Sequence, residues 1–141
     1  GAASEASLRT GLQVLSEGKA LGIYPEGTRS PDARLYRGRT GIARMIMAMD
    51  AKVPVVPVAM IDTEKVMPIG TTIPRVRRIG IVIGEPIDFS RYSGMHADRF
   101  LMRAITDEVM SELHALSNQE FCDIYASSVR NKMNTVSRLS A

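Results

Sequence analysis

The sequence predicts an α/β fold, with a mixed sheet flanked by helices. Short apolar runs typical of strands alternate with longer segments whose apolar residues repeat at helical spacing. The expected order is helix, strand, long loop, helix, strand, loop, strand and then helices. The chain has 141 residues and 45% hydrophobic content, which suits one globular domain.

The first two elements are expected within residues 4–25. Ser4 is the predicted N-cap of a helix that stops at Gly18, and three leucines share one face of this helix, namely Leu8, Leu12 and Leu15. Residues 21–24 form an apolar run that predicts a core strand. Pro25 has no N–H group to donate, so the chain should leave the sheet there.

The segment after this strand, Tyr24–Ser30, has the composition of an anion site. Gly27 lets the backbone approach a ligand closely, and Thr28 offers a hydroxyl group. Arg29 presents a planar fork of donors that matches a phosphate group. A phosphorylated small molecule would fit this set. The alternative is a tight turn in which Glu26 and Arg29 pair on the surface.

The following loop is rich in arginine and leads into a second expected helix. The five arginines are Arg29, Arg34, Arg37, Arg39 and Arg44. Thr40 is the predicted N-cap, because Ile42, Met45, Ile46 and Met49 repeat at helical spacing. A helix N-terminus beside Arg29 and Arg39 would hold a phosphate group, whereas Arg34 and Arg37 are expected at the solvated surface.

The second strand is expected over Val53–Ile61, which contains two prolines. Because proline removes hydrogen bonds from a ladder, this strand should be an edge, a bulge or a strand bent beside a site. From the residues alone, a purely structural core role is the alternative.

The remaining elements follow from simple periodicity. Alternating Ile79, Ile81 and Ile83 predict a third strand, and apolar residues over Asp98–Leu116 predict a long amphipathic helix that covers the sheet. The polar residues 127–141 are expected to form a mobile tail, which leaves residues 1–126 as the domain portion.

Composition narrows the classes of partner. The 18 basic and 15 acidic side chains give a net charge of +3, and Arg75, Arg77 and Arg78 form a second basic cluster that suits an anionic lipid surface. Nucleic acid is not an expected partner, because the chain has few aromatic residues and no Trp. The single Cys122 excludes an internal disulfide, and without a Cys/His cluster no metal site is predicted.

Four sequence blocks, in this order, resemble the 1-acyl-sn-glycerol-3-phosphate acyltransferases: YPEGTRS at 24–30, RGRTG at 37–41, VPVVPVAM at 53–60 and GEPI at 84–87. The resemblance runs from about Ser4 to Ala126. It implies a fold like that of glycerolphosphate acyltransferases. It also implies transfer of a fatty acyl group from acyl-CoA or acyl carrier protein to 1-acyl-sn-glycerol 3-phosphate, which gives phosphatidic acid and needs no further cofactor.

The resemblance also implies roles for individual residues. The substrate-binding set would be Glu26, Gly27, Thr28, Arg29 and Arg39, and the acyl chain would contact Val56 and Pro57. Arg29 would bind the acceptor phosphate, with Gly27 and Thr28 shaping the loop. Glu26 would order the loop or orient Arg29, because a bare carboxylate facing phosphate would repel it.

One part of the family pattern is missing from the chain. In the family, a His-x-x-x-x-Asp pair supplies the base that activates the acceptor hydroxyl. At that spacing His96 is followed by Leu101 and His114 by Gln119, so both are expected to be plain surface or helix histidines. We therefore expect the C-terminal part of an acyltransferase domain, incomplete and inactive alone.

Two alternatives to a piece of an enzyme remain. One is a natural non-catalytic relative, and the other is a module that binds anions or anionic lipids through the arginine-rich loop. No apolar run is long enough to span a bilayer and no signal peptide is visible, so any attachment of this segment to a membrane is expected to be peripheral, and an anchor could lie outside these residues. The expected location is the cytoplasmic face of a membrane.

Overall fold

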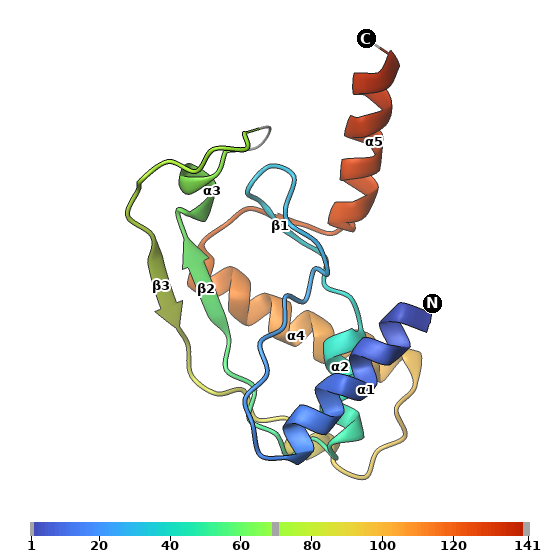
Figure 1. The fold of residues 1–141 in the computed structure, drawn as a ribbon. Helices are drawn as coiled ribbons and strands as arrows, with labels where there is room; N and C mark the ends of the chain where they lie inside the picture. Colours follow the sequence, from blue (N-terminus) through green and yellow to red (C-terminus); the bar gives the residue numbers. More distant parts are fainter. Residues whose placement is uncertain (1, 69–70, 140–141) are drawn as a thin grey trace.

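The computed structural model describes residues 2–68 and 71–139, and it combines helices with short strands (Figure 1). The elements, in chain order, are α1 (Ala2–Ser16), β1 (Leu35–Tyr36), α2 (Gly41–Ala48), β2 (Val58–Ile61), α3 (Thr63–Val66), β3 (Gly80–Ile83), the 3-10 helix η1 (Ser90–Tyr92), α4 (Arg99–Ser117), β4 (Phe121–Cys122) and α5 (Ala126–Leu139).

The strands form two separate pairs instead of the single mixed sheet that the sequence predicts. β1 and β4 pair in parallel, with Leu35 opposite Phe121. β2 and β3 pair antiparallel, from Val58 opposite Ile83 to Ile61 opposite Gly80. The α/β class is therefore confirmed in coarse form, with the strands divided between two small sheets.

The prediction of a core strand over residues 21–24 is wrong. These residues have an irregular backbone, and the Tyr24 side chain is 79% exposed. An apolar run becomes a strand only when a neighbouring strand pairs with it, and among residues 2–68 and 71–139 none does. The apolar residues instead line a groove that is described below.

Three predicted helices are present, with differences at their starts. α1 begins at Ala2 instead of after Ser4, and Gly18 ends the segment with φ of 73°. Thr40 precedes α2 as predicted, but within the described residues its side chain makes no capping hydrogen bond. At α4 the Asp98 carboxylate accepts the N–H groups of Phe100 and Leu101, both at 2.8 Å, which confirms the predicted start.

The second strand is shorter than the apolar run that predicts it. Ladder pairing covers Val58–Ile61, and before it Val55 makes an isolated bridge with Ile87. Pro57 lies between these two parts and contributes only its carbonyl group, which accepts Gly84 N–H at 2.9 Å. The expected interruption by proline is therefore seen, and β3 forms where isoleucines alternate.

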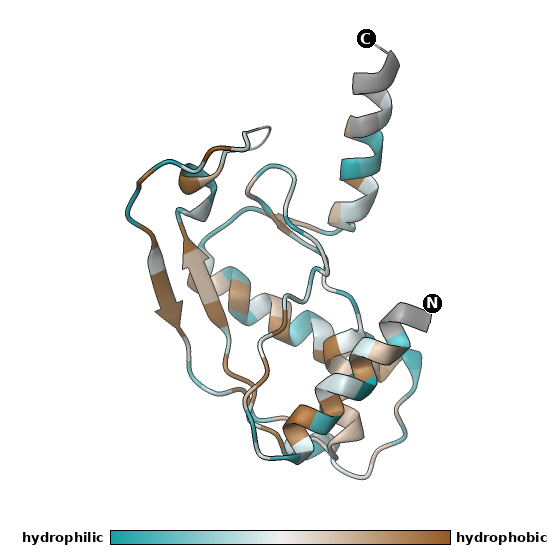
Figure 2. Ribbon diagram, in the orientation of Figure 1, coloured by the Kyte–Doolittle hydropathy of each residue, from teal (hydrophilic) through white to brown (hydrophobic). Residues whose placement is uncertain are grey.

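The core lies where α2 and α4 cross. Its buried apolar residues are Ala43, Ile46, Ala51, Phe89, Ile105 and Val109. In contrast, Figure 2 shows strongly apolar residues along β3, and the Ile81 and Ile83 side chains there are mostly exposed.

Residues 127–139 are helical, although their polar composition predicts no helix. They belong to α5, which stands away from the body of the molecule in Figure 1. The mobility of this segment stays a prediction.

Candidate substrate groove

A groove of about 770 Å³ brings together residues that are far apart in the sequence. Its lining comes from most of residues 21–30, from residues 55–60, from α3 and from the α4 side chains Val109 and Leu113. Five of the seven residues proposed from the sequence line it, namely Glu26, Thr28, Arg29, Val56 and Pro57.

The backbone turn at residues 24–27 presents this loop to the groove. Gly27 donates its N–H to the Tyr24 carbonyl at 3.0 Å and has φ of 69°, which favours glycine. A Cβ atom at this position would lie 2.8 Å from Cδ of Arg39. Gly27 thus lets the Arg39 side chain pass close to the turn, while Arg39 N–H donates to the Pro25 carbonyl at 2.8 Å.

Glu26 is half-buried and is used to hold the loop. Its Oε2 atom accepts the backbone N–H of Tyr36 in β1 at 2.9 Å. Burial raises the pKa of the Glu26 carboxyl, the Tyr36 N–H lowers it, and the negative charge of Asp32 raises it further. This contact favours the loop-ordering role for Glu26 over pairing with Arg29.

Arg29 is exposed and reaches across to the end of α3. Its Nη2 group donates to the carbonyl of Met67. This hydrogen bond occupies one edge of the guanidinium group and leaves further N–H donors for a ligand. The Arg29 guanidinium group is therefore held at the edge of the groove by the Met67 carbonyl.

Arg39 points to a different neighbour, at the start of α5. Its Nη2 group donates to Ser127 Oγ at 2.9 Å, and its guanidinium group lies 5.4 Å from the ring centre of Tyr125. Arg29 thus contacts the end of α3, whereas Arg39 contacts the start of α5. Joint binding of one phosphate group by the two arginines stays a prediction.

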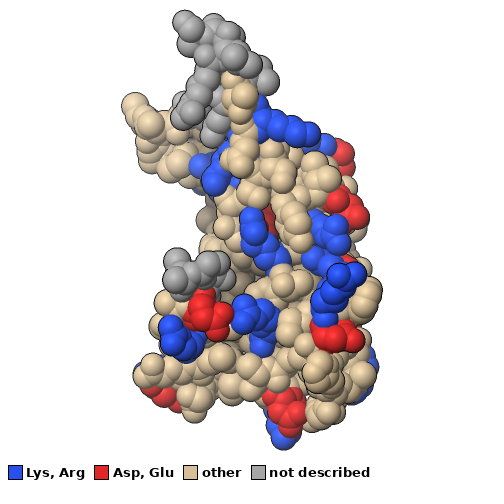
Figure 3. Space-filling model, turned by 90° about the vertical axis from the view of Figure 1, so that its right-hand side faces the viewer, with Lys and Arg blue, Asp and Glu red and all other residues tan. Residues whose placement is uncertain are grey.

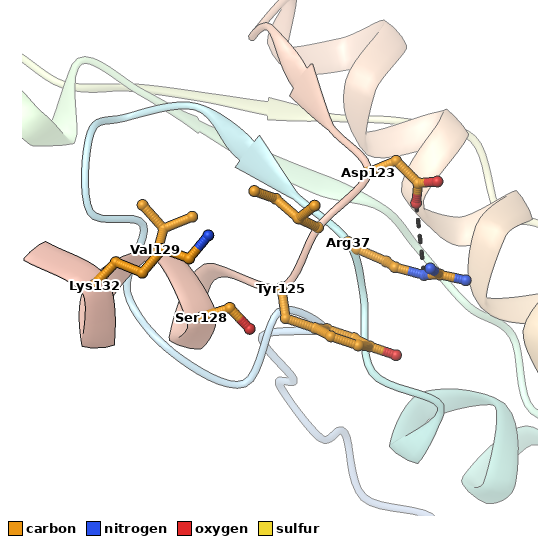
Figure 4. Close-up of a pocket in the computed structure, with 7 residues that line it drawn as sticks. Arg37, Asp123, Tyr125, Ser128, Val129 and Lys132 are labelled. Carbon is orange, nitrogen blue, oxygen red and sulfur yellow. Dashed lines mark ion pairs between the residues drawn. The ribbon is translucent and has the colours of Figure 1, made fainter.

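A smaller cavity of about 250 Å³ lies beside that contact (Figure 4). Arg37 extends along the Tyr125 ring there, 5.7 Å from its centre, and its Nε atom lies 3.5 Å from the Asp123 carboxylate. Figure 3 shows Lys and Arg side chains interspersed with acidic ones on the face that carries α5 and α1. This face is therefore mixed in charge.

The residues expected to contact an acyl chain differ in exposure. Val56 is 45% exposed and Pro57 is buried, yet both line the groove. Leu21, Ile23 and Met60 add further apolar surface to the same lining. The groove thus joins apolar surface to the polar turn that carries Arg29.

Sequence reasoning missed the contribution of α3. Thr63, Glu64 and Met67 line the groove, and Met67 fixes Arg29 through its carbonyl group. The polar run Asp62-Thr63-Glu64 directly after a strand was the available signal, since Asp and Thr favour helix starts.

Groups that could serve other chemistry are few. His96 and His114 are exposed, as predicted. The described part of the chain has no grouping of three or more His, Cys, Asp or Glu side chains placed to bind a metal ion. Among the helices within residues 2–68 and 71–139, none combines the length and apolar character needed to cross a bilayer.

Comparison with known proteins shows similarity to one class of enzyme. Residues 2–61 match the family model described as Acyltransferase. This match to part of an acyltransferase domain confirms the resemblance found in the sequence. No solved structure matches.

The relatives within this class share one name. The chain is 30% identical over 114 residues to the 1-acyl-sn-glycerol-3-phosphate acyltransferase of Bacillus subtilis (strain 168), which covers 80% of this chain and 52% of that protein. It is 33% identical over 85 residues to the chloroplastic 1-acyl-sn-glycerol-3-phosphate acyltransferase LPAT1 of Arabidopsis thaliana, which covers 60% of this chain and 23% of that protein. The chain thus spans about half the length of the bacterial relative and less of the plant one.

Proposed function

We propose that this chain is part of an enzyme that transfers a fatty acyl group from acyl-CoA or acyl carrier protein to 1-acyl-sn-glycerol 3-phosphate, with phosphatidic acid as product. The observation that carries the proposal is the shared groove, where Arg29 and the turn at Gly27 adjoin the apolar residues Val56 and Pro57. An acceptor with a phosphate head and an acyl tail needs both kinds of surface. The names of the relatives support the same acceptor.

Each groove residue has a distinct role in this proposal. Arg29 binds the acceptor phosphate through the donors that Met67 leaves open, because guanidinium groups match phosphate geometry. Glu26 fixes the loop through Tyr36 and so keeps its carboxylate occupied by an N–H donor. Val56 and Pro57 contact the acyl chain.

The base for the reaction is proposed to come from outside these 141 residues. Attack by the acceptor hydroxyl on a thioester carbonyl requires a group that removes the hydroxyl proton, within hydrogen-bond reach of it. The chain has two histidines, and neither has an Asp at the family spacing. In this proposal the assembled enzyme works at the cytoplasmic face of a membrane, attached peripherally.

A thiol-release assay tests this division of roles. The purified 141-residue chain, given an acyl thioester and lysophosphatidic acid, should release no more free thiol than a sample without acceptor. Full-length protein that includes a His-x-x-x-x-Asp block should release thiol only when the acceptor is present. Acceptor-dependent release by the 141-residue chain would contradict the proposal and direct attention to Glu26, His96 and His114.

A module that binds anions without chemistry is the second candidate, and the exposed Arg29 beside an open groove is what favours it. The two functions separate in the same assay. If full-length protein binds lysophosphatidic acid yet releases no thiol from any acyl donor, the binding module is correct.

A further inference from the structure

The segment between α3 and β3, residues 71–79, exposes apolar side chains to an unusual degree. Ile73 is 78% exposed and Val76 is fully exposed, and Ile79 at the end of the segment is also exposed. Exposure of such side chains to water is unfavourable in free energy. Neighbouring exposed apolar residues mark contact surfaces more often than single ones do.

Basic side chains alternate with these apolar ones. Arg75, Arg77 and Arg78 are exposed, and within the described residues no carboxylate forms an ion pair with any of them. A hydrogen bond to Asp62 raises the pKa of Lys65 on α3, and the nearby positive charge of Arg77 opposes this shift. The segment therefore combines unpaired positive charge with exposed apolar groups.

The ends of the segment are tied to the rest of the molecule. Thr71 Oγ1 donates to the Pro68 carbonyl at 2.6 Å, and Arg75 N–H donates to the Val66 carbonyl at 2.7 Å. The hydrogen bond at Arg75 returns the chain to the end of α3, so Val76 lies beyond an anchored point. The exposed Val76 side chain thus lies in a segment that is anchored to α3 at one end and continues into β3 at the other.

We propose that residues 71–79 bind the surface of an anionic lipid bilayer, with Ile73 and Val76 entering the interface and Arg75, Arg77 and Arg78 binding lipid phosphates. Apolar side chains gain free energy on leaving water, and basic residues are attracted to the negative potential of such a surface. The alternation of both kinds in one short segment suits a surface that is apolar just beneath a layer of charge.

Lipid fits this segment better than nucleic acid does. Single-stranded nucleic acid is bound through aromatic side chains that stack on bases, and residues 71–79 contain none. The apolar side chains here are aliphatic and β-branched, which suits insertion between acyl chains.

Binding through this segment would bring the groove to the membrane. Met67, four residues before Thr71, lines the groove and accepts the hydrogen bond from Arg29. A lipid acceptor could then pass from the bilayer to Arg29 over a short path. This consequence rests on the proposed function, whereas lipid binding itself does not.

Flotation with vesicles tests the proposal on the full chain without any assay of activity. Vesicles of phosphatidylcholine and phosphatidylserine in equal parts should carry the protein upward, and vesicles of phosphatidylcholine alone should carry little. Replacing Arg75, Arg77 and Arg78 by Gln should lower the partition constant at least tenfold, because each basic residue near such a surface contributes about fivefold. High salt should have a similar effect.

A matched control distinguishes the effect of this segment on lipid binding from the effect of net charge. Replacing three exposed arginines elsewhere, namely Arg9, Arg99 and Arg130, by Gln removes the same charge but should change the partition constant far less. Equal losses in the two triple variants would overturn the proposal, because binding would then follow net charge alone. Unchanged binding after the loss of Arg75, Arg77 and Arg78 would overturn it as well.

A fluorescence experiment tests insertion directly, since the chain has no Trp. In the Val76→Trp variant, emission should shift to shorter wavelength when the mixed anionic vesicles are added. In the Phe100→Trp variant, on the exposed first turn of α4, emission should not shift. A shift in both variants or in neither would overturn the proposal, and a shift of Val76→Trp with phosphatidylcholine vesicles alone would overturn the role of the arginines.

Discussion

Residues 24–39 and residues 58–83 both border the groove, yet they are built in opposite ways. The first region is fixed by hydrogen bonds to its own backbone, through Glu26 to Tyr36 and through Arg39 to Pro25. The second region is a pair of strands and a connecting segment in which Ile81 is 60% exposed. The first region is ordered by hydrogen bonds, and the second leaves apolar surface open.

This difference indicates what each region is suited to do. A site for a charged ligand needs donors whose positions are set before binding, since ordering them later costs free energy. A surface that contacts a partner or a lipid layer needs exposed apolar groups instead. Changes in the first region should therefore affect ligand kinetics and stability, and changes in β3 should affect folding little.

The largest expected effect is at Arg29. If the proposed function is correct, Arg29→Ala in the full-length protein should lower kcat/KM for lysophosphatidic acid by about ten- to a hundredfold, because a hydrogen bond to a charged group is lost. Arg29→Lys should recover part of this loss, since charge remains without the planar fork. The thioester KM should stay nearly constant, as steady-state kinetics with each substrate varied would show.

Arg9→Ala on α1 is the control for that experiment, because Arg9 is exposed and outside the groove lining. If Arg29→Ala weakened the acyl donor and left the acceptor unaffected, the loop would hold the phosphates of the donor. The assignment of the two substrates would then be reversed.

The next largest effect is expected at Gly38, where the first region packs closely against α4. A Cβ atom on Gly38 would lie 2.9 Å from Cγ2 of Thr106 and 2.8 Å from Sδ of Met110, and both neighbours are buried. Gly38→Ala should therefore lower the free energy of unfolding by about 1–3 kcal/mol, measured by urea denaturation. Gly22→Ala is the control, since a Cβ atom there has no described neighbour within 4 Å. Equal stability of the two variants would show that the loop can move away from α4.

Glu26 tests the internal hydrogen bond of the first region. Glu26→Ala leaves the Tyr36 N–H without its acceptor and should cost about 1–3 kcal/mol, whereas Glu26→Gln keeps an acceptor oxygen and should cost less. Burial, the largest cause, raises the pKa of this carboxyl above its ordinary value of 4.5. The folded state then binds the proton more tightly than the unfolded chain does, so the contribution of Glu26 to stability falls as pH rises from about 4.5 through the folded pKa.

The free energy of unfolding, measured across that pH range, tests this contribution by comparing the variants with the unchanged protein. The stability of Glu26→Gln relative to Glu26 should increase as pH rises through the window and then become constant. A relative stability that decreased instead would mean that the ionised carboxylate is the favoured form in the fold.

The smallest effect is expected in the second region. Ile81→Thr keeps a β-branched side chain at an exposed strand position and should change the free energy of unfolding by less than about 0.5 kcal/mol. Ile46→Thr makes the same exchange at a buried position on α2 and should cost more than about 2 kcal/mol. Similar losses in thermal or urea unfolding would show that Ile81 is covered in solution, for example by a second copy of the chain.

Several features of this protein followed from the sequence because their causes are local. The start of α4 depends on Asp98 and on apolar residues three and four positions apart, and both can be read along the chain. Alternating isoleucines gave β3, and the proline positions predicted the interruption before β2. The membership of Arg29 and Val56 in one site came from the family resemblance, and the shared groove agrees with it.

Other features depended on contacts between distant residues. Residues 21–24 have the composition of a strand, but their backbone stays irregular because no described strand pairs with it. Arg29 and Arg39 are ten positions apart, yet one is held by Met67 and the other by Ser127. Sequence by itself determined the class of fold, the spacing of apolar residues along the helices and the residue types of the loop at 24–30. Only the tertiary structure decided the partners of each strand and each arginine, because pairing and burial are properties of residues brought together from different parts of the chain.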